Sequence, residues 1–291
     1  MRLSVVIPAL NEERHLGQLL SDIRRQSLRP EEVIVVDAGS SDATVRIAEL
    51  SSCTAVLHGE PPVARGRNLG GYSAKGDLIF FLDADIRLPE HFFEDFVGEV
   101  ERRGLDIACP RYLPYGSSPT IRAIHAFWNT LLKGFERTLP SGAGHCIAMR
   151  SKLFRESRGF DPSLKFDDIA LVRRLAKWAR FGLVDTNVLV SDRRYREQGI
   201  LRTFLLHLLM APAFALGKFE WANHVAYEFG DHSQYPRENA PAAPGMKTWH
   251  SGKRSGLYSA ECVEDVFSEV RIATARLGLR SLLRATPYPA I

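Results

Sequence analysis

The sequence predicts an α/β protein in which a mostly parallel sheet is flanked by helices and followed by a largely helical C-terminal extension. Two observations support this prediction. In the first half of the chain, short apolar runs alternate with stretches of helical periodicity, as they do when helices cover both faces of a parallel sheet. After residue 192 the alternation stops, and residues 200–219 are apolar almost all round. We therefore expect one domain over residues 1–192 and a helical extension over residues 193–291.

Hydrophobic periodicity divides the first half of the chain into strands and helices. The expected buried strands cover residues 3–7, 33–36, 55–57 and 78–82. The expected helices between them cover residues 12–26, 42–50 and 68–74. Asp42 stands where it would cap the second of these helices.

The rest of the chain is less regular. We expect a strand beginning at 107, a helix over 119–135, a glycine-rich loop over 141–145, a strand over 146–149 and a helix from about 168. Beyond the domain boundary we expect a helical stretch over 200–219 interrupted at Pro212, a Pro/Gly-rich loop over 233–256 and an amphipathic helix over 260–283.

Composition sets the broad class of the protein. Of its 291 residues 45% are hydrophobic and 25% charged, which is ordinary for a soluble globular protein. The net charge of +4 is small, and we expect no nucleic acid among the partners. The four cysteines have no metal-ligand spacing and no signal peptide precedes the first strand, so we expect a cytoplasmic protein. No window reaches the roughly 20 apolar residues of a membrane-spanning helix.

The most informative feature is Asp83-Ala84-Asp85, which directly follows the apolar run 78–82. Two acids separated by one residue point to the same side of an extended chain. Their oxygens can hold a divalent cation such as Mg²⁺ or Mn²⁺, which in turn binds the phosphates of a substrate. Asp37 and the turn 8–12 also follow strands and should meet the acids at one edge of the sheet. The sequence therefore predicts a ligand site at this edge.

Several segments together resemble the family 2 glycosyltransferases, enzymes with a nucleotide-sugar-binding GT-A fold. The matching segments are residues 5–12, 35–44, 65–70, 76–85, 159–161 and 166–168, with a weaker match at 191–195. The resemblance implies a GT-A fold and transfer of a sugar from a nucleotide diphosphate sugar to a hydroxyl or phosphate acceptor. UDP is the more frequent nucleotide of the donors in this family, and GDP is the alternative. The resemblance also implies that transfer inverts the anomeric configuration of the sugar.

The resemblance further implies roles for individual residues. Asp83 and Asp85 match the ligands of the Mg²⁺ or Mn²⁺ that holds the diphosphate, with Asp85 the more direct ligand. Asp168 stands where the family places its general base, and Asp167 lies beside it. The residues implied to contact the donor are Pro8, Ala9, Asn11, Glu12, Asp37, Gly39, Arg67, Asp83 and Ala84. These roles suit the chemistry, because a sugar hydroxyl needs a base to take its proton and the departing diphosphate needs positive charge.

Some positions have more than one interpretation. Asp168 also stands where an acid commonly caps a helix, and the second acid that the family often carries two residues later is Ala170 here. Asp161 or His145 would be the next candidate for the base, and His145 could instead shape the acceptor pocket. Two further candidates are Arg193-Arg194, which would grip a phosphate or form a solvated turn, and His232 as a late metal ligand.

Alternatives also remain for the C-terminal region and for the function. Residues 200–219 are interpreted as core or as a homodimer contact in preference to an apolar surface on the inner face of a membrane. A catalytically silent nucleotide-sugar-binding subunit is the main alternative to an enzyme. A sugar nucleotidyltransferase is less favoured, because it would need a glycine-rich loop with Lys or Arg where this chain has residues 8–12.

Overall fold

The computed structural model describes residues 1–51, 53–142 and 144–223. Residues Met1–Asn223 form one compact unit, so this unit extends past the expected boundary at residue 192. The expected loop 233–256, the expected helix 260–283 and His232 lie outside the described residues. Among the described helices, none combines the length and the apolar character that crossing a bilayer requires.

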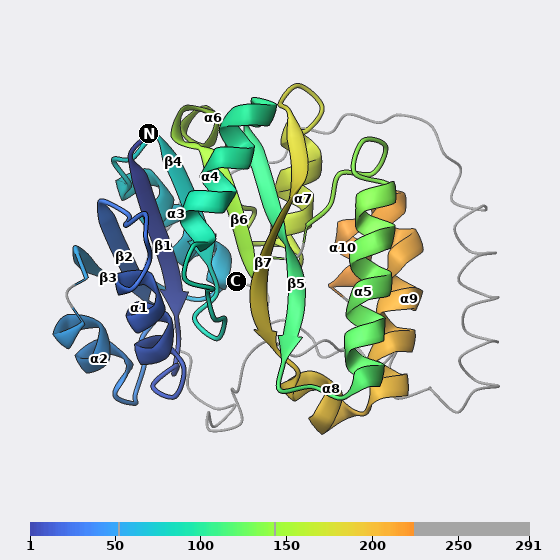
Figure 1. Cartoon of the computed structure of the whole chain (residues 1–291), viewed down its shortest axis with the longest axis horizontal. Coiled ribbons are helices and arrows are strands. Elements are labelled where there is room, and N and C mark those ends of the chain that lie inside the picture. Colours follow the sequence, from blue (N-terminus) through green and yellow to red (C-terminus); the bar gives the residue numbers. More distant parts are fainter. Residues whose placement is uncertain (52, 143, 224–291) are drawn as a thin grey trace. The chain divides into compact units, whose positions relative to one another are not determined.

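A seven-stranded sheet in the order β3-β2-β1-β4-β6-β5-β7 forms the centre of this unit (Figure 1). Its strands are β1 (Leu3–Ala9), β2 (Glu32–Asp37), β3 (Ala55–His58), β4 (Leu78–Leu82), β5 (Ile107–Tyr115), β6 (Cys146–Arg150) and β7 (Phe181–Ser191). The first four strands are parallel to one another, and β5 is parallel to β7. Strand β6 runs antiparallel to β4 and β5, and its register with β5 consists of Ile107↔Met149 and Ala108↔Ala148. The mostly parallel sheet is thus confirmed.

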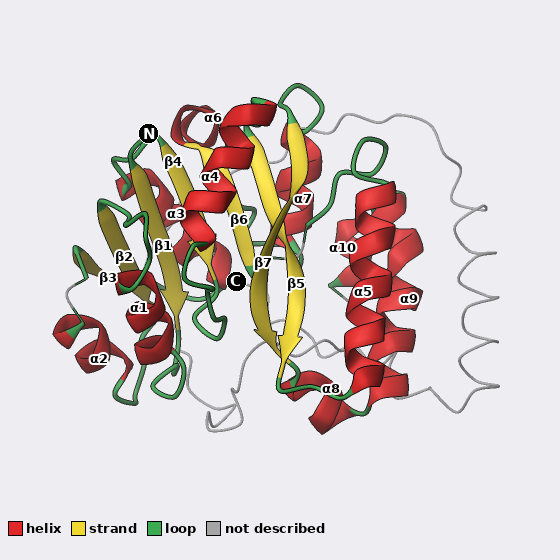
Figure 2. Cartoon of the chain, viewed as in Figure 1, coloured by secondary structure: helices red, strands yellow, loops and turns green. Residues whose placement is uncertain are grey.

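Helices lie on both sides of this sheet (Figure 2). They are α1 (Leu16–Arg24), α2 (Thr44–Leu50), α3 (Val63–Ser73), α4 (Phe92–Arg103), α5 (Pro119–Gly134), α6 (Ser151–Glu156), α7 (Asp167–Leu175), α8 (Arg193–Gln198), α9 (Ile200–Ala215) and α10 (Phe219–Ala222). Helix α1 begins later than expected, because the backbone N–H groups of Asn11 and Glu12 are bound by Ser40 in the loop after β2 and by Thr44 at the start of α2. Helix α9 continues through Pro212, whose own side chain is exposed.

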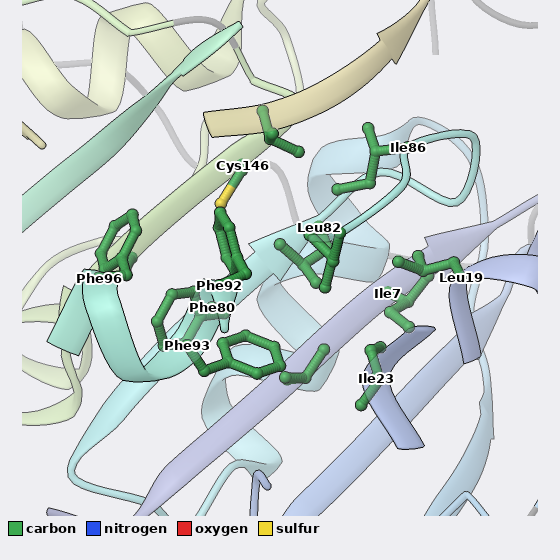
Figure 3. Packing of buried hydrophobic residues seen from close by; sticks show 14 of the residues in the cluster. Ile7, Leu19, Ile23, Phe80, Leu82, Ile86, Phe92, Phe93, Phe96 and Cys146 are labelled. Carbon is green, nitrogen blue, oxygen red and sulfur yellow. The ribbon is translucent and has the colours of Figure 1, made fainter. Parts of the chain in front are cut away.

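Two hydrophobic clusters hold the helices against the sheet. Adjacent residues of β4 serve opposite faces: Phe80 belongs to one cluster and Phe81 to the other. Around Phe80 the rings of Phe93 and Phe96 pack edge-on, at centroid distances of 4.9 and 5.0 Å (Figure 3). Truncating such a ring to alanine typically costs about 3–5 kcal/mol. Because β4 is buried on both faces, the residues that follow it are held in fixed positions.

Two elements were not among those expected from the sequence. Helix α4 carries Phe92, Phe96 and Val100 at helical spacing, so its signal was present in the sequence and was missed. Strand β7 has no such signal, because the polar residues 185–187 interrupt its apolar run. Its place is set by parallel pairing with β5 over most of its length.

Candidate functional site

The ends of several strands meet at one edge of the sheet. In the parallel pair β1–β2, Ala9 lies opposite Asp37, so the turns that follow these strands are neighbours. In the antiparallel pair β4–β6, Leu82 lies opposite Cys146. The residue after Leu82 is therefore next to the residue before Cys146, and the Asp83 N–H donates to the carbonyl of His145 at 3.0 Å. This register brings an acid and a histidine from distant segments together.

Asp83, Asp85 and His145 form a group that can hold a metal ion, since one ligand atom from each lies within 4.8 Å of the others. The side chain of Ala84 points the other way and is buried in the core. Carboxylate oxygens alone would suit Mg²⁺, whereas an added imidazole nitrogen suits Mn²⁺ better. The donor set therefore fits a divalent cation. As a ligand, His145 was missed by sequence reasoning, because the register that places it cannot be read from the sequence.

Both oxygens of Asp83 are already engaged by the protein. Oδ1 accepts a hydrogen bond from Arg67 Nη2 at 2.9 Å, and Oδ2 lies 3.1 Å from His145 Nδ1. Burial alone would raise the pKa of Asp83, but Arg67 and His145 outweigh it and hold that pKa below its ordinary value. Burial opposes protonation of His145, whereas the hydrogen bond to Asp83 favours it, and the pKa of His145 is raised. No hydrogen bond or ion pair to Asp85 is found within the described residues.

Arg67 links this group to helix α7. Its side chain is 6% exposed, and its guanidinium donates from Nη1 to Asp167 Oδ1 at 3.1 Å. It also lies over the ring of Phe160, 5.4 Å from the ring centre. Arg67 reaches these partners because α3 lies close to β1. A Cβ at Gly70 of α3 would collide with Val6 of β1, so a glycine is needed for this close approach. The guanidinium of Arg67 is thus enclosed between the end of β4 and the start of α7.

Asp167 and Asp168 occupy the first turn of α7 and point to different partners. Asp167 binds Arg67, whereas the Oδ2 of Asp168 lies against Gly144, where a Cβ would overlap it. Burial raises the pKa of Asp167 to about 7 and also raises the pKa of Asp168, in each case against the opposing charge of Arg67. Asp168 is 9% exposed. The N-cap of α7 is Phe166, so Asp168 lies inside the helix and is not its capping residue.

The turn after β1 is fixed by the loop after β2. Asn11 has a left-handed backbone (φ 55°), and its Oδ1 accepts from the Ser41 N–H at 2.9 Å. The Glu12 N–H donates to Thr44 Oγ1 at 2.8 Å. These bonds hold the two turns together as one surface at the edge of the sheet.

The other residues expected at the donor surface lie at the same edge. Asp37 is buried, and its carboxylate accepts from the N–H groups of Gly39 and Ser40 at 3.0 and 3.1 Å. Pro8 faces helix α3, where a Cβ on Gly66 would lie 3.3 Å from its Cβ. Ala9 is buried at the end of β1.

Glu12 completes the acidic side of the site, and α8 supplies a basic side. Burial, reinforced by the charge of Asp85, raises the pKa of Glu12 to about 8, while Arg193 acts in the opposite direction. Glu12, Asp85 and Arg193 are therefore close enough to interact.

Asp161, the alternative base, is exposed and caps its own turn by accepting from the Ser163 N–H at 2.9 Å.

Sequence comparison gives the family of the chain. The model of Glycosyl transferase family 2 matches residues 4–158. The succinoglycan biosynthesis protein ExoA of Rhizobium meliloti is 28% identical over 283 residues, which cover 89% of this chain and 83% of that protein. Three further curated glycosyltransferase relatives match over shorter stretches, and the chain spans between 33% and 42% of their length.

Solved structures agree on the fold. The mannosyltransferase PcManGT from Pyrobaculum calidifontis, solved with GDP-Man and Mn²⁺, has a TM-score of 0.58 at 20% identity, covering 76% of this chain and 70% of that one. TarS 1–349 of S. aureus, in complex with UDP-GlcNAc, has a TM-score of 0.55 at 20% identity and covers 66% of this chain and 59% of its own. The chain therefore has a GT-A fold and belongs to glycosyl transferase family 2.

Proposed function

We propose that this protein is a metal-dependent glycosyltransferase that moves a sugar from a nucleoside diphosphate sugar, with UDP the first nucleotide to test, to a hydroxyl or phosphate acceptor. One observation carries the proposal. The metal-capable group of Asp83, Asp85 and His145 is joined through Arg67 to the acids at the start of α7, at the edge where parallel strands end. A cation site and a second pair of buried acids are thus held in one fixed assembly.

The donor would lie on the surface formed by the turns after β1 and β2. Asn11 and Glu12 are already fixed there by hydrogen bonds to Ser41 in the loop after β2 and to Thr44 at the start of α2, so little further ordering is needed on binding. Asp83, Asp85 and His145 would hold Mg²⁺ or Mn²⁺, which when bound supplies positive charge to the diphosphate. Arg193 brings a second positive charge to the same surface.

Asp168 would act as the general base. A carboxylate held in a buried position takes up a proton more readily than one in water, and the pKa of Asp168 is raised by burial. Asp167 is bonded to Arg67 and is therefore less suited to accept a proton from the acceptor. Its role would be to fix α7, so that Asp168 stays beside Gly144. A base acting on the acceptor in a single displacement leads to inversion at the sugar carbon.

Both nucleotides deserve a test, because UDP-GlcNAc is bound to TarS and GDP-Man to PcManGT on this same fold. The first experiment is calorimetric titration of UDP and GDP, each with and without Mn²⁺, into wild type and Asp85→Ala. We expect one nucleotide to bind only with the metal, and this binding to be lost in Asp85→Ala. Asp95→Ala, which removes an exposed acid of α4, is the matched control and should bind as wild type does.

A transfer assay then separates an enzyme from a silent binding subunit. With the nucleotide identified, release of UDP or GDP from several donor sugars is measured with wild type and Asp168→Asn. Donor turnover in wild type supports the enzyme. If wild type binds the nucleotide but turns over none of the donors, with or without candidate acceptors, the silent subunit becomes the better interpretation.

A further inference from the structure

Helices α5, α8 and α9 enclose polar groups that the proposed chemistry does not use. His125 Nε2, Trp128 Nε1 and Thr203 Oγ1 are buried and have no hydrogen-bond partner among the residues that the structure describes. A buried polar group left without a partner costs roughly 1–3 kcal/mol, so a folded protein rarely retains several in one place. This concentration indicates a ligand that supplies the missing partners.

Rings of α8 and α9 lie against the two unpartnered rings of α5. The rings of His125 and Tyr195 of α8 are 5.5 Å apart, and those of Trp128 and His207 of α9 are 6.1 Å apart. Burial, followed by the positive charge of Arg194, lowers the pKa of His207 to about 4. Arg194 precedes Tyr195 in α8, so the short helix that contacts His125 also carries this positive charge. The three helices meet here, with α8 near the ends of the other two (Figure 2).

This cluster borders the metal-capable group. Asn129 of α5 is bonded to the backbone of Tyr112 in β5 through both its amide atoms, at 2.9 and 3.1 Å. The ring of Tyr112 in turn lies 6.0 Å from that of His145. His125 is one helical turn before Asn129 and shares its face of α5. Burial and then the charge on His145 lower the pKa of His125 to about 4.

The chemistry of the cluster is that of an anion site. An indole N–H only donates, a guanidinium only donates and stays charged, and a neutral imidazole donates through one nitrogen. Asp192, the N-cap residue of α8, accepts from Ser117 Oγ at 2.8 Å and pairs with Arg196 at 2.7 Å. The cluster thus offers several donors and one permanent positive charge to an incoming group with several acceptor oxygens.

We propose that His125, Trp128, Thr203 and Arg194 bind the phosphate group of the acceptor, so that the acceptor is a phosphate monoester. The identification of the ligand as the acceptor rests on the proposed function, whereas the anion site itself does not. The diphosphate of the donor would be held at Asp83 and Asp85, and the cluster lies beyond His145 on the side of α5.

One exposed apolar side chain beside the cluster bears on the rest of the acceptor. Phe127 is 48% exposed, and its ring lies 5.3 Å from that of Trp128 and 6.1 Å from that of Phe204 in α9. A phosphate monoester with a hydrocarbon chain could cover Phe127, whereas a sugar phosphate would leave it in water. The two kinds of monoester are therefore separate arms of the test.

The test measures binding of inorganic phosphate, farnesyl phosphate and glucose 1-phosphate to the full chain by calorimetry and thermal shift. EDTA is present, so that no phosphate can be held through a metal at Asp85. Variants His125→Phe and Trp128→Phe remove donors while keeping apolar volume. His91→Phe and Trp178→Phe, at exposed side chains, are the matched controls.

We expect at least one monoester to bind wild type and both controls, and to bind His125→Phe and Trp128→Phe at least tenfold more weakly. The melting temperature of the ligand-free variants should not fall, because each loses a buried group that lacks a partner. Farnesyl phosphate binding alone identifies an apolar acceptor, and glucose 1-phosphate binding alone identifies a polar one. No binding of either monoester, or equal binding by all variants, overturns the proposal.

A second titration separates this proposal from the proposed function. Wild type saturated with UDP or GDP and Mg²⁺ is titrated with the monoester that binds. Simultaneous binding supports an acceptor site, whereas competition would place the phosphate in the donor site and overturn the inference. Monoester binding without any nucleotide binding would keep the anion site and remove the glycosyltransferase proposal.

Discussion

The guanidinium of Arg67 and the carboxylate of Asp167 form a buried ion pair in which Nη1 lies 3.1 Å from Oδ1 and 3.2 Å from Oδ2. The two residues come from α3 and α7, which are distant in the sequence. The pair therefore fixes the start of α7 against the end of β4, where Arg67 also binds Asp83. It holds the two groups of acids in one position relative to each other.

Removing the positive charge of Arg67 should lower the free energy of unfolding. Arg67→Met leaves Asp83 and Asp167 buried without their partner, and breaking a buried pair from one side typically costs about 3–5 kcal/mol. Arg65→Met, on the same helix, breaks only the exposed pair with Glu60 and should cost about 0–1 kcal/mol. Urea unfolding of both variants checks this difference. Equal losses in the two variants would show that the buried pair contributes no more than the surface one.

Asp168→Asn tests the general base. The amide keeps nearly the same shape but cannot accept the proton, so we expect turnover to fall about 10²–10⁴-fold while nucleotide binding changes little. Donor consumption and calorimetric binding are measured on the same preparation. Unchanged turnover would show that Asp168 is not the general base. Loss of nucleotide binding would show that Asp168 contributes to binding of the donor.

The sequence predicted the part of the site that depends on local pattern. Strands β2 and β4 contain the apolar runs 33–36 and 78–82, and β1 is apolar over 3–7 except at Ser4. Asp37 and Asp83 directly follow the two runs in the sequence. The two acids of α7 could be placed only through the family resemblance. The position of His145 depends on the Leu82↔Cys146 register between distant strands, which no local pattern contains.

The polar cluster beside α9 could not be predicted for a similar reason. His125 and Thr203 lie in helices whose periodicity indicates which face is buried, but not which polar groups remain without partners there. Residues 200–219 were expected to be core or a subunit contact. In the structure one face of α9 is buried, with Leu206 and Met210, and the other exposes Leu201 and Leu208.

Gly144 offers a direct test of how closely the acids are packed. A Cβ at this position would overlap Asp168 Oδ2 and lie 3.2 Å from Arg67 Nη2. Gly144→Ala should therefore destabilise the protein by about 1–3 kcal/mol and reduce turnover, because both side chains must shift. Gly134→Ala, where the added methyl would meet nothing within 4 Å, is the control. If the control is as damaging as Gly144→Ala, this packing argument is wrong.

His125 should lower the stability of the folded protein in mild acid. Burial, and then the charge of His145, lowers its pKa to about 4 from an ordinary 6.5, so at this position the unfolded chain binds more protons than the folded one between these values. His125 therefore reduces the free energy of unfolding as the pH drops from about 6.5 to about 4. His207 acts in the same direction, whereas the raised pKa values of Glu12, Asp167, Asp168 and His145 act in the opposite one.

The measurement is the melting temperature of wild type and His125→Phe at pH 7 and at pH 5. We expect the shift from pH 7 to pH 5 to be less unfavourable for the melting temperature of His125→Phe than for that of wild type, since the variant has one fewer group to protonate on unfolding. The groups with raised pKa values are present in both proteins and cancel in the comparison. The same change in melting temperature in both proteins would contradict the assignment.

His145→Ala should change the preference between metals. Imidazole nitrogen is a better ligand for Mn²⁺ than for Mg²⁺, so its removal should weaken Mn²⁺-dependent nucleotide binding more than Mg²⁺-dependent binding. Calorimetry with each metal gives the two ratios. His91→Ala, on an exposed side chain, should leave both unchanged. Equal weakening with both metals would assign His145 to the positioning of Asp83 alone.

The short pairing between β5 and β6 has a mechanical consequence. The sheet consists of two parallel ladders, β3-β2-β1-β4 and β5-β7, and β6 joins the second ladder through Ile107↔Met149 and Ala108↔Ala148. The two ladders are also joined in other ways. Each hydrophobic cluster contains residues of both ladders, such as Phe80 with Val188 in one and Phe81 with Leu183 in the other. Arg87, beyond the end of β4, is bridged to Leu189 of β7 by two backbone hydrogen bonds of 2.9 and 3.0 Å. Side-chain packing and this bridge, rather than an unbroken hydrogen-bond network across the sheet, therefore hold the two halves of the site at a fixed separation.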